Sequence, residues 1–154
     1  MGAAGVVFML SNNEIIETLK MINEENLDVR TVTMGISLRD CCHSDPKIAC
    51  QNIYDKITKY AQNLVKVAND IESELGIPII NKRISVTPIS IIAESANIDN
   101  YTCFAEALQR ATGEVGVNFL GGFSALVHKG FTKGDRILVD SIPDALTATR
   151  NICS

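Results

Sequence analysis

Two cysteines and a histidine stand next to one another in the stretch GISLRDCCHSDP, residues 35–46. These residue types ligate zinc, and a thiolate is also a nucleophile and a redox group. The stretch falls between an expected strand and an expected helix. Cys41, Cys42 and His43 are therefore open to three interpretations: metal ligands, reactive thiols, or ordinary turn residues.

The spacing of these residues argues against a metal site. Structural zinc sites place two to four residues between paired ligands, and Cys41 and Cys42 are adjacent. No second Cys/His pair has the required spacing, and Cys50 falls inside an expected helix. We therefore expect no metal ligands here, and the sequence names no cofactor.

Reactive thiols fit the position better, because a thiolate just before a helix is favoured by the positive end of the helix dipole. Cys41 and Cys42 are accordingly the candidate catalytic residues. The alternative stays open that one of them is a small buried apolar side chain and the other a turn residue. Cys103 is expected to pack on a helix.

Helix and strand signals alternate along the first half of the chain. The capping-box pattern SNNE at residues 11–14 predicts a helix start, and the β-branched stretch LDVRTVTMGISL at 27–38 predicts a strand. Asp45 as N-cap and Pro46 as the first helical residue begin the next helix, which we expect to run unbroken to Gly76.

The second half continues the alternation. We expect a strand over NKRISVTPIS (81–90), a helix over 100–112, a short strand over VNFL (117–120), a fourth strand over RILVD (136–140), and a helix that Pro143 begins. Alternation at this spacing predicts an α/β fold with mostly parallel strands and crossover helices.

The two longest strands each have one polar face. Thr31, Thr33, Gly35, Ser37 and Arg39 alternate with apolar residues in the first strand, and Arg83, Ser85 and Thr87 do so in the second. Parallel strands covered on both faces usually read as continuous apolar runs. The polar face is therefore either solvated, or the interior of a barrel or crevice that holds a ligand at the strand ends.

The ligand-holding interpretation predicts a set of binding residues: Ser37, Arg39, Arg83, Ser85, Thr87, Gly121, Gly122 and Ser124. Gly121 and Gly122 permit close approach of the backbone to an anion, with the amides of a following helix nearby. The stretch lacks the residue order of a P-loop or a nucleophile elbow. His128 is interpreted as a surface histidine in preference to a general base.

The pair Lys82-Arg83 has two interpretations. The two cations bind a carboxylate or phosphate, or they solvate the edge of a strand.

Composition narrows the class of protein. The net charge of −4 and a pI near 5.1 exclude the basic footprint of a nucleic-acid-binding protein. Five cysteines without a secretory signal indicate reduced thiols and a cytoplasmic location. Residues 1–10 are apolar but too short to span a bilayer, so we set them apart as an extension or cloning remnant and expect no membrane partner.

Several long stretches carry a family resemblance: LDVRTVTMGISLRDC, LGIPIINKRISVTPISII, GVNFLGGFSALVHKGFTKGD and ILVDSIPDAL. Together they resemble the N-terminal part of an uncharacterised prokaryotic family named for its likeness to pyruvate formate-lyase. The resemblance implies a ten-stranded α/β barrel related to pyruvate formate-lyase and anaerobic ribonucleotide reductase. Residues 11–154 would then form the N-terminal part of the barrel domain, and the chain would be a fragment of a longer protein.

The resemblance also bears on activity. Enzymes like pyruvate formate-lyase relay a radical through a cysteine pair, and Cys41-Cys42 is similar as a dipeptide. The chain contains no glycyl-radical motif of the Arg-Val-x-Gly-Tyr type, so the implied likeness is one of fold and not of radical chemistry.

We therefore expect an enzyme-like barrel that binds a small anionic metabolite. The alternative is a non-catalytic ligand-sensing or assembly protein on the same fold. We expect the chain to form a homo-oligomer or to associate with the remainder of a longer protein, because a partial barrel exposes strand edges.

Overall fold

A computed structural model of the 154-residue chain describes residues 11–24, 29–128 and 130–154. Its centre is a sheet of four parallel strands, in the order β1 (Val29–Ile36), β2 (Ile79–Val86), β3 (Phe119–Gly121) and β4 (Ile152–Cys153). Helices separate the strands along the chain, so the predicted α/β fold with parallel strands is confirmed. The expected extension at 1–10 and the expected strand start at 27–28 lie outside the described residues.

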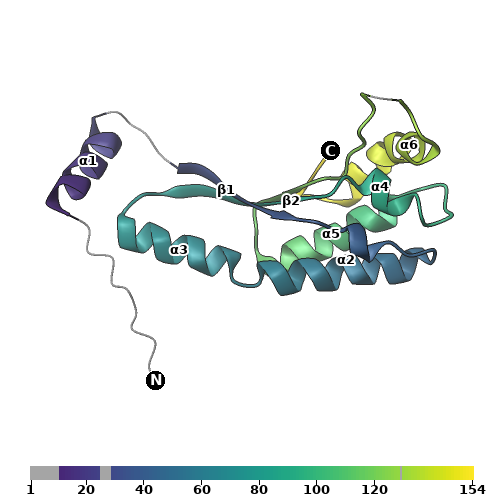
Figure 1. The fold of residues 1–154 in the computed structure, drawn as a ribbon, viewed down its shortest axis with the longest axis horizontal. Coiled ribbons are helices and arrows are strands. Elements are labelled where there is room, and N and C mark those ends of the chain that lie inside the picture. Colours follow the sequence, from purple (N-terminus) through teal and green to yellow (C-terminus); the bar gives the residue numbers. More distant parts are fainter. Residues whose placement is uncertain (1–10, 25–28, 129) are drawn as a thin grey trace, which may run out of the picture.

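Three helices lie along one face of the sheet: α2 (Pro46–Ala61), α3 (Leu64–Leu75) and α5 (Thr102–Val115) (Figure 1). The short α4 (Ile89–Ala93) and α6 (Lys133–Ala148) pack together near one end of the sheet, and a 3₁₀ turn (Arg39–Cys41) follows β1. The first helix, α1 (Asn12–Asn23), begins at the predicted capping box and stands apart from the sheet (Figure 1).

The alternation of strand faces is confirmed. Ile36 and Leu38 from the first strand segment, and Ile84 from β2, are buried under the helices. Thr33 and Ser85 point to the opposite face and are exposed in the described part of the chain. Burial on one face only therefore accounts for the period-two pattern that the sequence carries.

The single long helix expected from Pro46 to Gly76 is wrong. Helix α2 ends at Ala61, and α3 begins at Leu64 after Asn63, whose side chain makes no capping bond. Asparagine has a low preference for helix interiors, because its side chain competes for backbone hydrogen bonds. The predicted stop at Gly76 is confirmed, with φ of 69° and its N–H donating to the Glu72 carbonyl.

The fourth strand expected at 136–140 is also wrong, as is a helix start at Pro143. Both segments belong to α6, which begins after a capping box between Thr132 and Asp135 and contains Pro143 in its interior. The buried residues Leu138, Ser141 and Ala145 recur at helical spacing. A five-residue apolar run does not by itself distinguish a strand from a buried helix segment, and here the longer period decides.

The end of the second strand differs from the expected one for a local reason. The second strand ends at Val86 rather than at residue 90, because Pro88 stands at the N-cap of α4.

Within the described parts of the chain, no helix combines the length and apolar composition needed to cross a membrane.

Candidate anion site on the open face of the sheet

A hollow of about 370 Å³ lies on the polar face of the sheet. Its walls come from all four strands, with Thr33, Arg83, Ile84, Ser85, Phe119, Gly121 and Cys153 as the lining residues. Strand register explains why they meet. Thr33, Arg83 and Phe119 are direct neighbours across β1, β2 and β3, and Ser85, Gly121 and Cys153 form the next polar-face row.

Glycines keep the second row open. Gly35 and Gly121 flank Ser85 on either side, in β1 and β3. A Cβ added at either glycine would meet no atom within 4 Å. Gly121, which lines the hollow, therefore leaves it open, and Gly35 adds no side chain on the other side of Ser85.

Arg83 provides the charge of the hollow. Its guanidinium lies over the Phe119 ring, with 5.5 Å between the guanidinium carbon and the ring centroid. Its Nε is buried and has no hydrogen-bond partner among the described residues. A buried donor without an acceptor is costly, so this nitrogen is suited to an acceptor supplied by a ligand.

Lys82 and Arg83 are neighbours in sequence, but their side chains lie on opposite faces of the sheet. Strand β2 lies between β1 and β3, so the interpretation of this pair as strand-edge charges is wrong. The Lys82 ammonium pairs with Glu72 of α3 at 2.7 Å on the helix-covered side. This ion pair holds the pKa of the Glu72 carboxyl below its usual range. Arg83 alone is left to face the hollow.

Gly122 and Ser124 do not line the hollow; their carbonyls bind the backbone at the start of α4. Gly122 has φ of 130°, and a Cβ there would lie 2.8 Å from the Val86 carbonyl oxygen. The carbonyls of Gly122 and Ser124 accept hydrogen bonds from Ile89 and Ser90, at the start of α4. No helix directly follows the glycine pair, since α6 begins at residue 133; the expected helix amides beside these glycines are therefore wrong.

Ser37, Arg39 and Thr87 lie beyond the carboxyl ends of β1 and β2, away from Arg83's hollow. The Thr87 hydroxyl accepts a hydrogen bond from the Leu38 N–H at 3.1 Å and so ties the two strand ends together. Ser37 lines a separate hollow of about 250 Å³ with Lys56, and Arg39 is exposed.

The adjacent cysteines occupy the 3₁₀ turn and its end. Cys41 is 3% exposed, and burial raises the pKa of its thiol to about 11, with the neighbouring Asp40 charge adding to the effect. This direction is opposite to the expected one. Cys42 is exposed. Asp40 forms an ion pair with Lys56 of α2.

His43 lies just before α2 and binds the backbone of its N-cap residue, Asp45. Its Nδ1 accepts a hydrogen bond from the Asp45 N–H at 2.9 Å, and the Asp45 carboxylate accepts one from the Lys47 N–H at 2.8 Å. Within the described residues, no group of three or more His, Cys, Asp or Glu side chains is placed to hold a metal ion.

Of the predicted binding residues, Arg83, Ser85 and Gly121 meet in one hollow. The predicted binding residues did not include Thr33, Phe119 and Cys153, although Thr33 was placed on the polar face that would line a pocket. Thr33 could have been predicted, because it shares the polar face of the first strand with Gly35 and Ser37. Cys153 could not have been predicted, because β4 is only two residues long and shows no strand pattern in the sequence.

The fold and the site define an α/β protein with a parallel sheet and an arginine-centred hollow on one face. The chain belongs to the family described as Uncharacterised ACR (DUF711), whose family model matches residues 20–154. The family membership predicted from sequence is thus confirmed as an uncharacterised family, while the relation to pyruvate formate-lyase stays a prediction.

Curated relatives are similar over nearly the whole chain. A UPF0210 protein of Desulforamulus reducens is 68% identical over 146 residues, which is 95% of this chain and 32% of the relative. UPF0210 proteins of Halothermothrix orenii and Ruminiclostridium cellulolyticum are 64% and 62% identical over the same shares. The chain therefore spans about a third of the length of these relatives.

Proposed function

We propose that the protein binds a small anionic metabolite on the polar face of its sheet, with Arg83 as the principal contact. The observation that carries the proposal is the buried Arg83 Nε, which has no partner among the described residues and borders a hollow. A carboxylate or phosphate oxygen would satisfy this donor and neutralise the guanidinium charge at once.

The surroundings of Arg83 suit such a ligand. The Phe119 ring fixes the plane of the guanidinium, which presents several donors in a fork that matches carboxylate and phosphate. The hydroxyls of Thr33 and Ser85 lie on the same face within reach of further oxygens. A hollow of about 370 Å³ accommodates a small molecule and not a large cofactor.

In the proposed architecture this face is the interior of an enzyme-like α/β barrel, related to pyruvate formate-lyase in fold. Ligands in such folds lie toward the carboxyl ends of parallel strands, where Ser37, Arg39, Thr87, Gly122 and Ser124 remain candidate contacts. A cytoplasmic location and association with a second copy or with further barrel strands belong to the same proposal.

A second candidate function is a non-catalytic ligand-sensing or assembly protein on the same fold. The observation that favours it is Cys41, since a buried thiol whose pKa lies near 11 is a poor nucleophile at neutral pH. Both functions need the Arg83 hollow, and they differ only in whether a reactive group accompanies it.

Thermal unfolding with inorganic phosphate or malonate at constant ionic strength tests the binding proposal. At an anion concentration of roughly 100 times Kd, we expect stabilisation of about 2.7 kcal/mol, which raises Tm by about 5–10 °C. The stabilisation should vanish in Arg83→Gln, because the guanidinium supplies both the charge and the donors.

The chain offers a matched control. Arg136 of α6 also lies over a phenylalanine, at 5.6 Å from the Phe131 ring, but it is exposed to solvent. Arg136→Gln should keep the full anion effect. If neither anion stabilises the protein, or if Arg83→Gln responds as the unaltered protein does, the proposal is contradicted.

A further inference from the structure

Two cysteines far apart in sequence meet between neighbouring helices. Cys50 lies on α2 and Cys103 on α5, and these two helices pack side by side beneath the sheet (Figure 1). Both thiols are half-buried, and they lie close enough for each to shift the pKa of the other. The pair is independent of the Arg83 hollow, which opens on the other side of the sheet.

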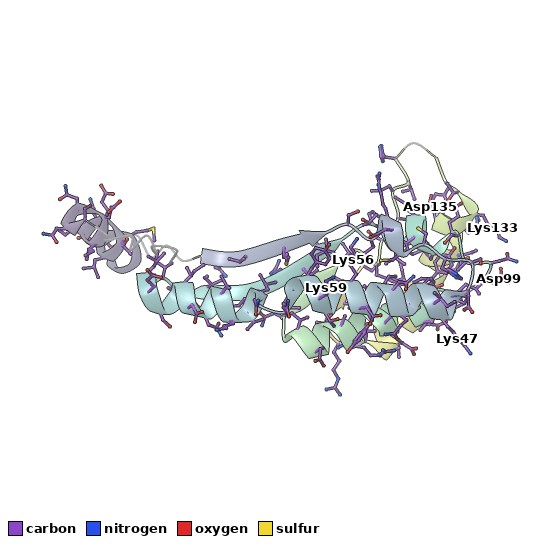
Figure 2. The ribbon with its side chains drawn as sticks, turned by 60° about the horizontal axis from the view of Figure 1, so that its bottom comes forward. Lys47, Lys56, Lys59, Asp99, Lys133 and Asp135 are labelled. Atoms are coloured by element: carbon purple, nitrogen blue, oxygen red, sulfur yellow. The ribbon has the colours of Figure 1, made fainter. Side chains whose placement is uncertain are left out.

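The pair borders a groove of about 780 Å³. Small apolar residues such as Pro46, Ile98 and Ala107 form part of its wall. Lys47 and Asp99 also line the groove and lie at the same end of the molecule (Figure 2). A small molecule can therefore reach the two sulfurs from solvent.

The two thiols are not equivalent. Cys103 is the second residue of α5, so its sulfur lies at the amide-rich, positive end of that helix. The neighbouring Cys50 thiol, and then the backbone amides of the first turn, lower the pKa of Cys103 to about 7. The pKa of Cys50 is raised, first by the neighbouring Cys103 and then by burial.

Charged side chains from both helices and from the segment before α5 face the groove. They are Lys47 of α2, Asp99 of the preceding segment, and Glu106 and Arg110 of α5. Glu106 opposes ionisation of both thiols, and Arg110, held over the Tyr54 ring at 4.7 Å, favours ionisation of Cys50. The balance favours ionisation of Cys103 over ionisation of Cys50.

We propose that Cys50 and Cys103 form a redox-active dithiol that reduces a small hydroperoxide entering the groove between α2 and α5. Cys103 is the attacking thiol, and Cys50 is the thiol that resolves the oxidised intermediate. The product on the protein is a disulfide that links the two helices.

The reaction balances in two steps. The Cys103 thiolate attacks one oxygen of the hydroperoxide and breaks the O–O bond, and the departing alkoxide takes a proton to become an alcohol. The Cys50 sulfur then attacks the resulting sulfenic acid, and the hydroxyl leaves with the Cys50 proton as water. Overall, two thiols and one hydroperoxide give one disulfide, one alcohol and one water.

Only two sulfur ligands meet at this place, and no third histidine, cysteine or carboxylate joins them into a metal-ligating group among the described residues. Two neighbouring thiols with unequal pKa values that line one open groove fit thiol oxidation better than tetrahedral metal binding.

The unaltered protein tests the proposal directly. The reduced protein is treated with one equivalent of hydrogen peroxide at neutral pH, and its mass should fall by about two mass units as the disulfide forms. Trypsin without reductant separates the cysteines into peptides 40–47, 48–56, 84–110 and 151–154. We expect the link to join 48–56 to 84–110. An unchanged mass, or a link between any other pair of peptides, would overturn the proposal.

Variants assign the two roles. In Cys50→Ser, the sulfenic acid cannot be resolved, so dimedone should label peptide 84–110. In Cys103→Ser, oxidation by peroxide should slow roughly tenfold, the gain expected from the larger thiolate fraction at neutral pH. Ser73→Ala is the control, because Ser73 is exposed on α3 and, among the described residues, bonds only to the Asn69 carbonyl, so the rate should stay unchanged.

Dimedone labelling of peptide 40–47 in place of 84–110, or an unchanged rate in Cys103→Ser, would contradict the assignment. Circular dichroism melting verifies that each variant is folded. The disulfide map of the unaltered protein decides the proposal even if a variant does not fold.

Discussion

Cys41 and Cys103 both stand close to the start of a helix, and their thiols lie in different electrostatic environments. Cys41 is in the 3₁₀ turn ahead of α2 and packs into the core beside the charge of Asp40. Cys103 is inside the first turn of α5 and faces a second thiol. The comparison teaches that a place near a helix start does not by itself favour a thiolate. The neighbouring Cys50 and the backbone amides of the first turn lower the pKa of Cys103, whereas burial and the Asp40 charge raise the pKa of Cys41.

The largest expected effect is a difference in alkylation rate between these two thiols. At neutral pH, iodoacetamide should label Cys103 on the order of a hundredfold faster than Cys41, after the higher intrinsic nucleophilicity of a high-pKa thiolate is taken into account. Peptides 84–110 and 40–47 report the two rates by mass spectrometry, with Cys42→Ser used to remove the exposed neighbour.

The pH dependence of the labelling rate is expected to differ between Cys103 and Cys41. Labelling of Cys103 should rise through a pKa of about 7 and then level off, whereas labelling of Cys41 should keep rising toward a pKa of about 11. Equal rates at neutral pH, or a shared midpoint, would show that the two environments do not differ as described.

A smaller effect is expected at Gly121 and Gly122. These two glycines are neighbours in sequence, as the two thiols are alike in position, but their surroundings differ. Gly122→Ala should destabilise the protein by roughly 2–4 kcal/mol, because φ of 130° and the close Val86 backbone both oppose a side chain. Gly121→Ala should change stability by less than about 0.5 kcal/mol, since a Cβ there meets open space.

Denaturant unfolding measures both values. Gly121→Ala carries a second expectation, because its methyl group would enter the hollow and weaken binding of phosphate. Equal losses of stability in the two variants would contradict the backbone role given to Gly122.

The smallest effect is expected at the ion pair between Asp40 and Lys56. Asp40→Asn should leave the midpoint of urea unfolding almost unchanged, because the Asp40 side chain is 70% exposed and the pair is screened by water. It should also lower the pKa of Cys41 slightly, since the carboxylate charge opposes ionisation of that thiol. Urea unfolding and the labelling profile of peptide 40–47 measure the two changes.

The sequence predicted the features that depend on local chemistry. The caps at Ser11, Asp45 and Gly76 and the two faces of β1 and β2 were all correct, because each depends on neighbouring residues or on a period of two. The break at Asn63 and the helical state of residues 136–140 were not predicted, because packing against other elements decides them.

The site was predictable only in part for the same reason. Arg83, Ser85 and Gly121 were chosen from strand periodicity, but the position of Phe119 beside Arg83 depends on the register between β2 and β3. The meeting of Cys50 with Cys103 depends on how α2 packs against α5, and no local pattern encodes that contact.

The proposed function depends on one donor, the Nε–H of Arg83, and nitrogen NMR observes arginine Nε–H groups individually. The Arg83 signal is identified by its loss in Arg83→Lys, and inorganic phosphate is then titrated at constant ionic strength. The account predicts a saturable shift of the Arg83 signal while the Arg136 signal stays in place. An unmoved Arg83 signal, or a non-saturating drift shared with Arg136, would contradict anion binding at the open face of the sheet.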